Sequence, residues 1–473
     1  MLFPTVDYAV FFLVVFAMAW SLRPYLVAHK ALLVIASCGF YAYWDWRFVP
    51  LLVGIALVGF AVARGLQVLG PAKRRARGGL LAAGVGACLA TLALFKYLGF
   101  AAASVLGLLA LLGVNPGPAR LPELALPVGV SFFVFHAISL MVDAWRGQIA
   151  VRVRAIDSLL YVAFFPQLVA GPILRAAAFL PQLAAPPART TIDAARALEL
   201  IAVGLVKKVL IAQLLATRLV DPVFESPADH SGLEVLLAVY GYAVQIYCDF
   251  SGYSDLAIGS ALLLGYKIPV NFDAPYCATS PRDFWRRWHI SLSTWLRDYL
   301  FIPLGGSRGG RLRTLANVGL TMLLGGLWHG AAWTFVAWGA FHAVGLIIHR
   351  GWAALPAVKT LRENRAWGVL AQVLTFHFVC AGWVLFRSPS LGVAGEVFTA
   401  LTRGARGPVP VWVAGLVLVA LLSSLISADG LVAARARFSR WPLIAQGIAF
   451  ALLVVALDAL GPRGVAPFIY FQF

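Results

Sequence analysis

The sequence contains few charged residues. Asp, Glu, Lys and Arg make up 12% of its 473 residues, whereas soluble domains contain about 25%. Apolar runs long enough to cross a hydrocarbon core of ~30 Å recur along the whole chain. Because a helix satisfies its own backbone hydrogen bonds in lipid, the composition excludes an ordinary soluble domain. It predicts an all-α polytopic membrane protein.

Acidic residues are especially scarce. The chain has 20 Asp and Glu against 38 Lys and Arg, which gives a formal net charge of +18. In a soluble protein this excess would suggest a nucleic-acid partner. Here the positive charge lies in loops between apolar segments. The positive-inside rule and attraction to anionic lipid headgroups are simpler explanations of this excess. We therefore expect membrane lipids as partners and no nucleic acid.

Cysteine is rare and has no ligand-like spacing. The five cysteines include no CxxC pair, and most lie in apolar segments, so we interpret them as small packed residues. No HExxH motif and no histidine pair with Cys or carboxylates at metal-ligand spacing occurs. We therefore predict no metal and no bound cofactor. Four isolated histidines on apolar segments are interpreted as packed, hydrogen-bonded residues, namely His136, His342, His349 and His377.

The sequence also lacks internal repeats, low-complexity tails and long linkers. We therefore predict one membrane domain over residues 1–473. Apolar segments predict roughly a dozen membrane helices, some of them short or re-entrant. These segments lie near residues 4–22, 31–44, 48–68, 79–112, 124–145, 156–174, 194–220, 233–264, 314–327, 331–349, 367–386, 411–427 and 441–460. The first has no basic flank or cleavage site, so we expect a retained helix.

Basic residues in the loops predict the orientation of the chain. None precedes the first apolar segment, whereas residues 70–78 contain a basic cluster and a further basic loop carries Arg146, Arg152 and Arg154. Basic loops alternate with loops that have few charges. The positive-inside rule then places the N-terminus outside and residues 70–78 in the cytoplasm.

Residues 280–299 have a strongly amphipathic pattern. Ser280 is a suitable N-cap, Pro281 fits the first helical position, and Asp283 resembles a capping box. On a helical projection one broad stripe is aromatic, and a narrow stripe contains Arg282, Arg286, His289, Ser293 and Arg297. We predict an amphipathic interfacial helix. Its arginines could anchor lipid headgroups or bind a phosphorylated substrate, and the two roles are compatible.

His329 is an ionisable residue in an almost charge-free apolar stretch. Residues 314–326 and 331–341 contain no charge, and Trp328 and Trp333 provide apolar walls around it. An ionisable ring at membrane depth needs a partner, a cavity or a function. His329 could donate a hydrogen bond to a neighbouring helix, or it could act as a general base.

Three further polar residues each have a functional and a structural interpretation. His289 lies among arginines and could be catalytic, substrate-positioning or structural. Asp249 and Asp255 lie in a long apolar segment and cannot stay charged there without partners. They could line a tunnel or active site, or they could belong to a helix-packing network.

Several stretches spread over most of the chain resemble the membrane-bound O-acyltransferase family. They are residues 127–133 (PVGVSFF), 164–172 (FFPQLVAGP), 249–255 (DFSGYSD), 284–298 (FWRRWHISLSTWLRD), 325–331 (GGLWHGA) and the aromatic C-terminus. The resemblance is strongest to the bacterial branch of the family that acetylates alginate. It implies that His329 is catalytic and that His289 occupies a second family position, where Asn or His usually stands.

The resemblance also implies the path of the acyl group. The family takes an acyl group from a cytoplasmic thioester, typically acetyl-CoA, and moves it across the membrane through the protein. In the bacterial polysaccharide branch, acetyl would pass through a central tunnel across the inner membrane. A periplasmic acetyltransferase partner of the SGNH type then modifies an exported polysaccharide such as alginate. The donor's phosphates would meet the basic residues Arg282, Arg286, Arg287 and Arg297. Trp328, Asp249 and Asp255 would contact the substrates.

Other acyl acceptors and donors stay open. D-alanyl transfer to teichoic acid from an acyl-carrier protein is one alternative, and acetylation of cellulose or peptidoglycan is another. A transporter without chemistry would predict broken helices in two repeated halves, and the sequence shows no such symmetry.

Overall fold

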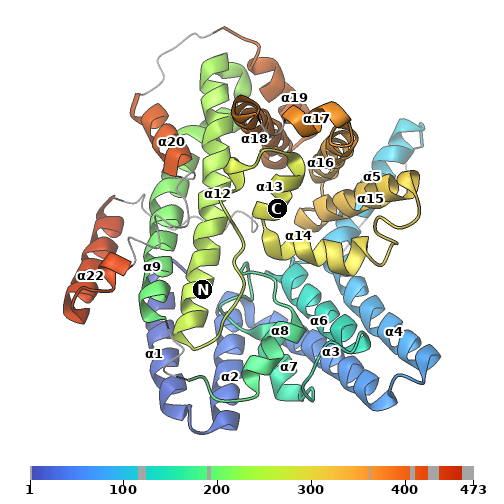
Figure 1. Cartoon of the computed structure of the whole chain (residues 1–473), viewed down its shortest axis with the longest axis vertical. Helices are drawn as coiled ribbons and strands as arrows, with labels where there is room; N and C mark the ends of the chain where they lie inside the picture. The colour runs from blue at the N-terminus through green and yellow to red at the C-terminus, as the bar shows by residue number, and fades with distance from the viewer. Residues whose placement is uncertain are drawn as a thin grey trace. The chain divides into compact units, whose positions relative to one another are not determined.

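The computed structural model describes residues 3–114, 124–188, 193–361, 364–404, 411–423 and 436–460 (Figure 1). Its regular elements within these ranges are all helices, which confirms the predicted all-α class. The chain divides into two compact units, Met1–Ile192 with Ala261–Ile268 and Asp193–Ser260 with Pro269–Phe473. The prediction of one domain stays a prediction. The aromatic C-terminus, one of the stretches that resemble the family, lies outside the described residues.

The first unit is a helical bundle in which α3 is central. α3 packs against α4, α6 and α7, while α2 packs against α1 and α7. The bounds are α1 Val6–Leu22, α2 Leu26–Asp45, α3 Val49–Leu69, α4 Arg74–Leu92, α5 Leu98–Leu111, α6 Val130–Trp145, α7 Ala155–Ala163 and α8 Ala176–Phe179.

The second unit contains the helices that carry the candidate site. α15 packs along α16, and α16 packs against α13 and α18 (Figure 1). The bounds are α9 Ala194–Leu205, α10 Gln213–Leu215, α11 Asp221–Glu225, α12 Gly232–Leu263, α13 Pro281–Arg287, α14 Ile290–Leu296, α15 Arg311–His329, α16 Trp333–Trp352, α17 Pro356–Leu361, α18 Arg365–Arg387, α19 Leu391–Ala400, α20 Val411–Ser423 and α22 Leu443–Leu460.

Several helical stretches are long and apolar enough to cross a membrane. Within the described ranges there are 5 of them, Leu26–Leu69, Arg74–Leu111, Ala194–Glu225, Gly232–Leu263 and Arg365–Arg387. Shorter apolar helices such as α1 and α6 add to this set. The protein is therefore a multi-pass membrane protein, and the total of roughly a dozen helices stays a prediction.

The apolar segment predicted at residues 156–174 is helical only in its first half. α7 ends at Ala163, and the following turns are almost entirely buried. Buried side chains satisfy this irregular backbone: Tyr161 Oη donates to the Leu174 carbonyl oxygen at 2.8 Å, and His136 Nε2 accepts from the Leu174 amide at 3.2 Å. Non-helical backbone is tolerated at membrane depth when protein groups satisfy it in this way. His136 thus has the hydrogen bond predicted for it.

Two glycines allow α15 and α16 to approach closely. A Cβ at Gly326 would lie 2.3 Å from the Phe335 carbonyl oxygen, and one at Gly339 would lie 2.5 Å from the Met322 carbonyl oxygen. Both obstructing atoms are backbone atoms and cannot rotate away. This close contact positions the end of α15, where His329 lies, against α16.

The variant Gly339→Ala is expected to lower thermal stability in detergent. Forcing a methyl group into a packed interface costs ~1–3 kcal/mol, which corresponds to a clear drop in the melting midpoint. The matched control is Gly319→Ala on α15, where a Cβ meets nothing within 4 Å. The control should keep or slightly raise the midpoint, because alanine favours helix. Equal midpoints for the two variants would show that the α15–α16 contact does not depend on Gly339.

Candidate functional site

His329 ends α15 inside a cage of aromatic rings. Its side chain is buried, with 4% of the residue exposed, and the chain leaves the helix at Gly330. The centroid of the His329 ring lies 5.0 Å from those of Trp328 and Trp338 and 5.2 Å from that of Phe386. α15, α16 and α18 therefore enclose one ionisable ring in an apolar environment.

The segment predicted as one helix over residues 280–299 is two short helices. Its start is as predicted, because Ser280 Oγ accepts from the Asp283 amide at 3.1 Å. α13 then ends at Arg287 and α14 begins at Ile290, because His289 takes a left-handed backbone conformation with φ of 42°. The prediction of a continuous helix is wrong at this point. The break turns His289 away from the arginine stripe, and the residue is fully buried.

Asn271 holds this break in place. Its Oδ1 accepts hydrogen bonds from the Ser291 amide at 3.2 Å and from Ser291 Oγ at 2.7 Å. The Asn271 carbonyl oxygen accepts from the Ile290 amide at 2.9 Å. Asn271 Nδ2 donates to Ser254 Oγ on α12 at 3.3 Å. A single side chain thus joins α12 to the start of α14.

Asn271 also determines which nitrogen of His289 carries the proton. Oδ1 of Asn271 lies 3.2 Å from His289 Nδ1. A carboxamide oxygen only accepts hydrogen bonds, so Nδ1 is the protonated nitrogen and Nε2 keeps its lone pair. Within the described residues Nε2 has no hydrogen-bond partner. Burial lowers the pKa of His289 to about 3, which leaves the ring neutral near neutral pH.

The two predicted histidines lie close together. The ring centroids of His289 and His329 are 6.4 Å apart, and Trp328 contacts both rings. Phe250 of α12 packs edge-on against His289 at 4.6 Å. The arrangement brings a neutral imidazole acceptor and a second imidazole into one enclosed apolar site, and histidine is the side chain that most often transfers protons to or from a reacting group.

The arginines of the amphipathic segment divide into two pairs. Arg287 donates to Asp283 at 3.1 Å, and Arg297 donates to Asp298 at 2.7 Å. Arg282 and Arg286 are exposed on α13, and neither has an ion-pair partner within the described ranges. These two guanidinium groups are therefore the ones available to an anionic ligand.

The two carboxylates of α12 form ion pairs with adjacent lysines. Lys207 Nζ lies 2.8 Å from Asp255, and Lys208 pairs with Asp249. These pairs join α12 to residues 206–212 and provide the partners that buried carboxylates need. A helix-packing network explains this pairing directly. A role for Asp249 and Asp255 beside the substrate stays a prediction.

The remaining histidines differ from one another. His377 bonds to Tyr240 Oη at 2.7 Å, as expected for a hydrogen-bonded residue. The same expectation is wrong for His342, because neither of its buried ring nitrogens has a hydrogen-bond partner in the described chain. Its ring instead packs between Trp338 at 4.8 Å and Trp285 at 5.1 Å. In the parts of the chain that are described, no three His, Cys, Asp or Glu side chains gather as metal ligands.

Comparison with known proteins identifies the family. Residues 131–391 match the profile of MBOAT, the membrane-bound O-acyltransferase family. The chain belongs to this family. It is therefore an acyltransferase, and the matched range includes both His289 and His329.

The chain is similar to proteins named for three different polymers. It is 41% identical over 376 residues to the probable alginate O-acetylase AlgI of Pseudomonas syringae pv. tomato, covering 78% of this chain and 69% of that protein. It is 34% identical over 398 residues to a peptidoglycan O-acetyltransferase of Helicobacter pylori, covering 78% and 72%. Identity to the teichoic acid D-alanyltransferase of Bacillus subtilis is 32% over 273 residues, covering 55% and 68%.

Proposed function

We propose that this acyltransferase takes acetyl from cytoplasmic acetyl-CoA and passes it across the inner membrane for O-acetylation of an exported polysaccharide such as alginate. The observation that carries the proposal is the enclosed pair His289 and His329, 6.4 Å apart, in a chain of the O-acyltransferase family. The O-acetylating relatives support acetyl over D-alanyl, because they cover 78% of this chain against 55%.

In this proposal His329 is the general base. Its imidazole takes the proton of the acceptor hydroxyl, and the hydroxyl oxygen forms a bond to the thioester carbonyl carbon. The C–S bond then breaks, and the CoA sulfur leaves with the electron pair and is protonated. Trp328 and Trp338 exclude water around the His329 ring and so limit hydrolysis of the thioester.

His289 positions the acceptor molecule next to its reacting hydroxyl in this mechanism. Because its Nδ1 proton is bound to Asn271, the neutral ring can only accept at Nε2. Since the reacting hydroxyl gives its only proton to His329, His289 Nε2 accepts from a different N–H or O–H donor of the acceptor molecule, and it cannot stabilise an oxyanion by donation. The proposal therefore assigns His289 to the acceptor side of the reaction and assigns no oxyanion contact to it.

Arg282 and Arg286 are proposed to bind the donor's phosphates, since guanidinium groups match phosphate oxygens. Arg287 and Arg297, already paired with Asp283 and Asp298, contribute less. The acetyl group is then proposed to pass to an SGNH-type periplasmic acetyltransferase, which places it on the polysaccharide, with the N-terminus of this chain on the same side of the membrane. These assignments rest on the family resemblance and on the distribution of basic loops.

The variant Arg282→Gln/Arg286→Gln is expected to raise the apparent KM for acetyl-CoA about two- to thirtyfold, given the ~0.2–1 kcal/mol typical of each exposed charged contact. The measurement is transfer of radiolabelled acetyl from acetyl-CoA into alkali-labile ester in membranes that contain the polysaccharide and its partner. The matched control, Arg350→Gln/Arg365→Gln, removes two exposed arginines elsewhere in the second unit.

Two results would contradict parts of the proposal. An unchanged KM in the α13 variant would assign these arginines to lipid anchoring. If wild-type membranes use an acyl-carrier thioester and not acetyl-CoA, the D-alanyl alternative is favoured.

A further inference from the structure

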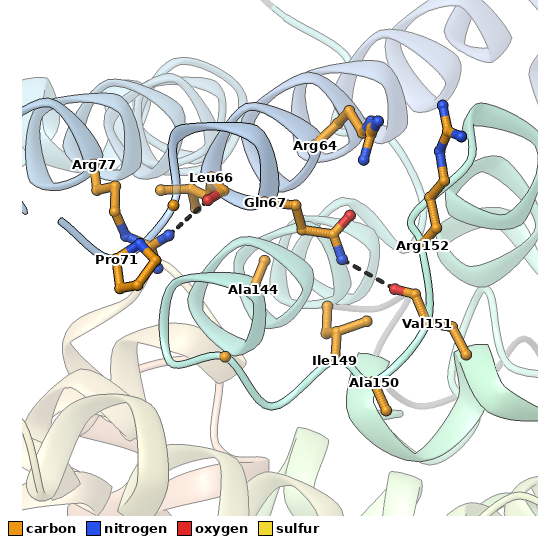
Figure 2. Close-up of a pocket in the computed structure, with 12 residues that line it drawn as sticks. Arg64, Leu66, Gln67, Pro71, Arg77, Ala144, Ile149, Ala150, Val151 and Arg152 are labelled. Atoms are coloured by element: carbon orange, nitrogen blue, oxygen red, sulfur yellow. Dashed lines mark hydrogen bonds between the residues drawn. The ribbon is translucent and has the colours of Figure 1, made fainter. Parts of the chain in front are cut away.

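The first unit contains a basic pocket of about 510 Å³ that the proposed mechanism does not use. It lies where α3 ends, α4 begins and α6 ends (Figure 2). Its lining combines arginines and apolar groups: Arg64, Leu66, Gln67, Gly70, Pro71, Arg77, Ala144, Gly147, Ile149, Ala150, Val151 and Arg152.

Hydrogen bonds fix the walls of the pocket. Gln67 of α3 donates to the Val151 carbonyl oxygen at 3.0 Å and accepts from the Val153 amide at 3.1 Å. Arg77 of α4 donates to the carbonyl oxygens of Leu66 at 2.6 Å and Trp145 at 2.7 Å. The two basic loops, residues 70–78 and 146–154, are therefore held together around one concave surface (Figure 2).

Positive charge in the pocket is not compensated by the protein. Arg64 and Arg152 line it, and Figure 2 draws both side chains at the same end. In the described parts of the chain neither guanidinium has a hydrogen-bond or ion-pair partner, and the lining includes no Asp or Glu. Two guanidinium groups without a partner favour an anion that has several oxygen atoms, and phosphate is one of the anions that guanidinium groups bind through paired hydrogen bonds.

The position of the pocket indicates where that phosphate comes from. α3 and α4 belong to the membrane-crossing stretches Leu26–Leu69 and Arg74–Leu111, so the pocket lies at the end of two spans, at the level of lipid headgroups. Leu66, Pro71 and Ile149 add apolar surface suited to the glycerol and upper acyl chain of a lipid. Basic pockets between membrane helices on the cytoplasmic side bind anionic headgroups.

We propose that this pocket binds the phosphate headgroup of an anionic phospholipid through Arg64 and Arg152. The site is independent of the acyl-transfer assignment, because none of its residues belongs to the candidate functional site. Soluble CoA offers the same phosphate chemistry, and the experiment distinguishes the two sources.

The test is native mass spectrometry of the full chain in detergent with phosphatidylglycerol or phosphatidylcholine added. Wild-type protein should retain phosphatidylglycerol in preference to phosphatidylcholine. Arg64→Gln/Arg152→Gln should bind phosphatidylglycerol at least about tenfold more weakly, since each basic residue near an anionic headgroup contributes roughly a factor of five. The control Arg350→Gln/Arg365→Gln removes the same charge outside the pocket and should bind as the wild type does.

Three outcomes would overturn the proposal. Equal retention of the two lipids would show that the pocket does not distinguish an anionic headgroup from a zwitterionic one. Equal weakening in the control would show a general charge effect. Binding of CoA by the wild-type protein at micromolar concentration that displaces phosphatidylglycerol, with the CoA binding itself lost in Arg64→Gln/Arg152→Gln, would assign the pocket to CoA phosphates instead of lipid.

Discussion

Replacing His329 by alanine is expected to abolish acetyl transfer while the protein still accumulates in the membrane. General acid–base catalysis contributes typically 10²–10⁴-fold to rate, and the aromatic side chains that surround His329, Trp328, Trp338 and Phe386, cannot take up a proton in its place. The measurement is the rate of label transfer from acetyl-CoA, normalised to the amount of protein in the membrane.

Two companion variants separate chemistry from packing. His329→Gln fills more of the space left by the ring but cannot take up a proton near neutral pH, so it should be as inactive as His329→Ala. His377→Ala removes an exposed histidine that bonds to Tyr240 and should keep near wild-type activity. Substantial transfer by His329→Gln would refute the general-base assignment, because size and polarity alone would then be sufficient.

The helices could be predicted from the sequence where apolar length decides the structure. The segment predicted at residues 233–264 is α12, Gly232–Leu263, because a continuous apolar run has one stable form in lipid. Residues 164–174 could not be predicted in this way. Hydropathy indicates that a segment is buried, but it does not distinguish a helix in lipid from irregular backbone buried in protein. The turns after Ala163 are stabilised by tertiary hydrogen bonds to Tyr161 and His136.

The candidate site could be predicted only in part. His329 stands out because an ionisable residue interrupts a charge-free run. The pairing of the α12 carboxylates could also have been predicted, since Lys207 and Lys208 interrupt another apolar segment. Asn271 could not be found. Its importance depends on the left-handed backbone conformation of His289. The helical periodicity of the sequence predicts ordinary helical backbone at that position.

Replacing His289 by alanine is expected to lower the transfer rate about tenfold or more, because the acceptor molecule loses the side chain that positions it. The left-handed backbone at His289 complicates this variant, since a non-glycine residue there costs roughly 1–2 kcal/mol. His289→Gly removes that cost together with the ring, so it should be as inactive as His289→Ala yet more stable. His289→Asn should retain more activity than either, because asparagine tolerates this conformation and keeps a polar group in place.

Asn271 provides the decisive control for this assignment. If it acts by fixing the proton on His289 Nδ1, Asn271→Ala should lower the rate in the wild type but change it little in a His289→Ala background. Its effect on thermal stability should persist in both backgrounds, because the bonds to Ser291 and Ser254 are lost either way. Additive losses of activity in the double variant would mean that Asn271 supports the α13–α14 turn alone. A change below about threefold for His289→Ala, less than ~1 kcal/mol, would make His289 a structural residue as well.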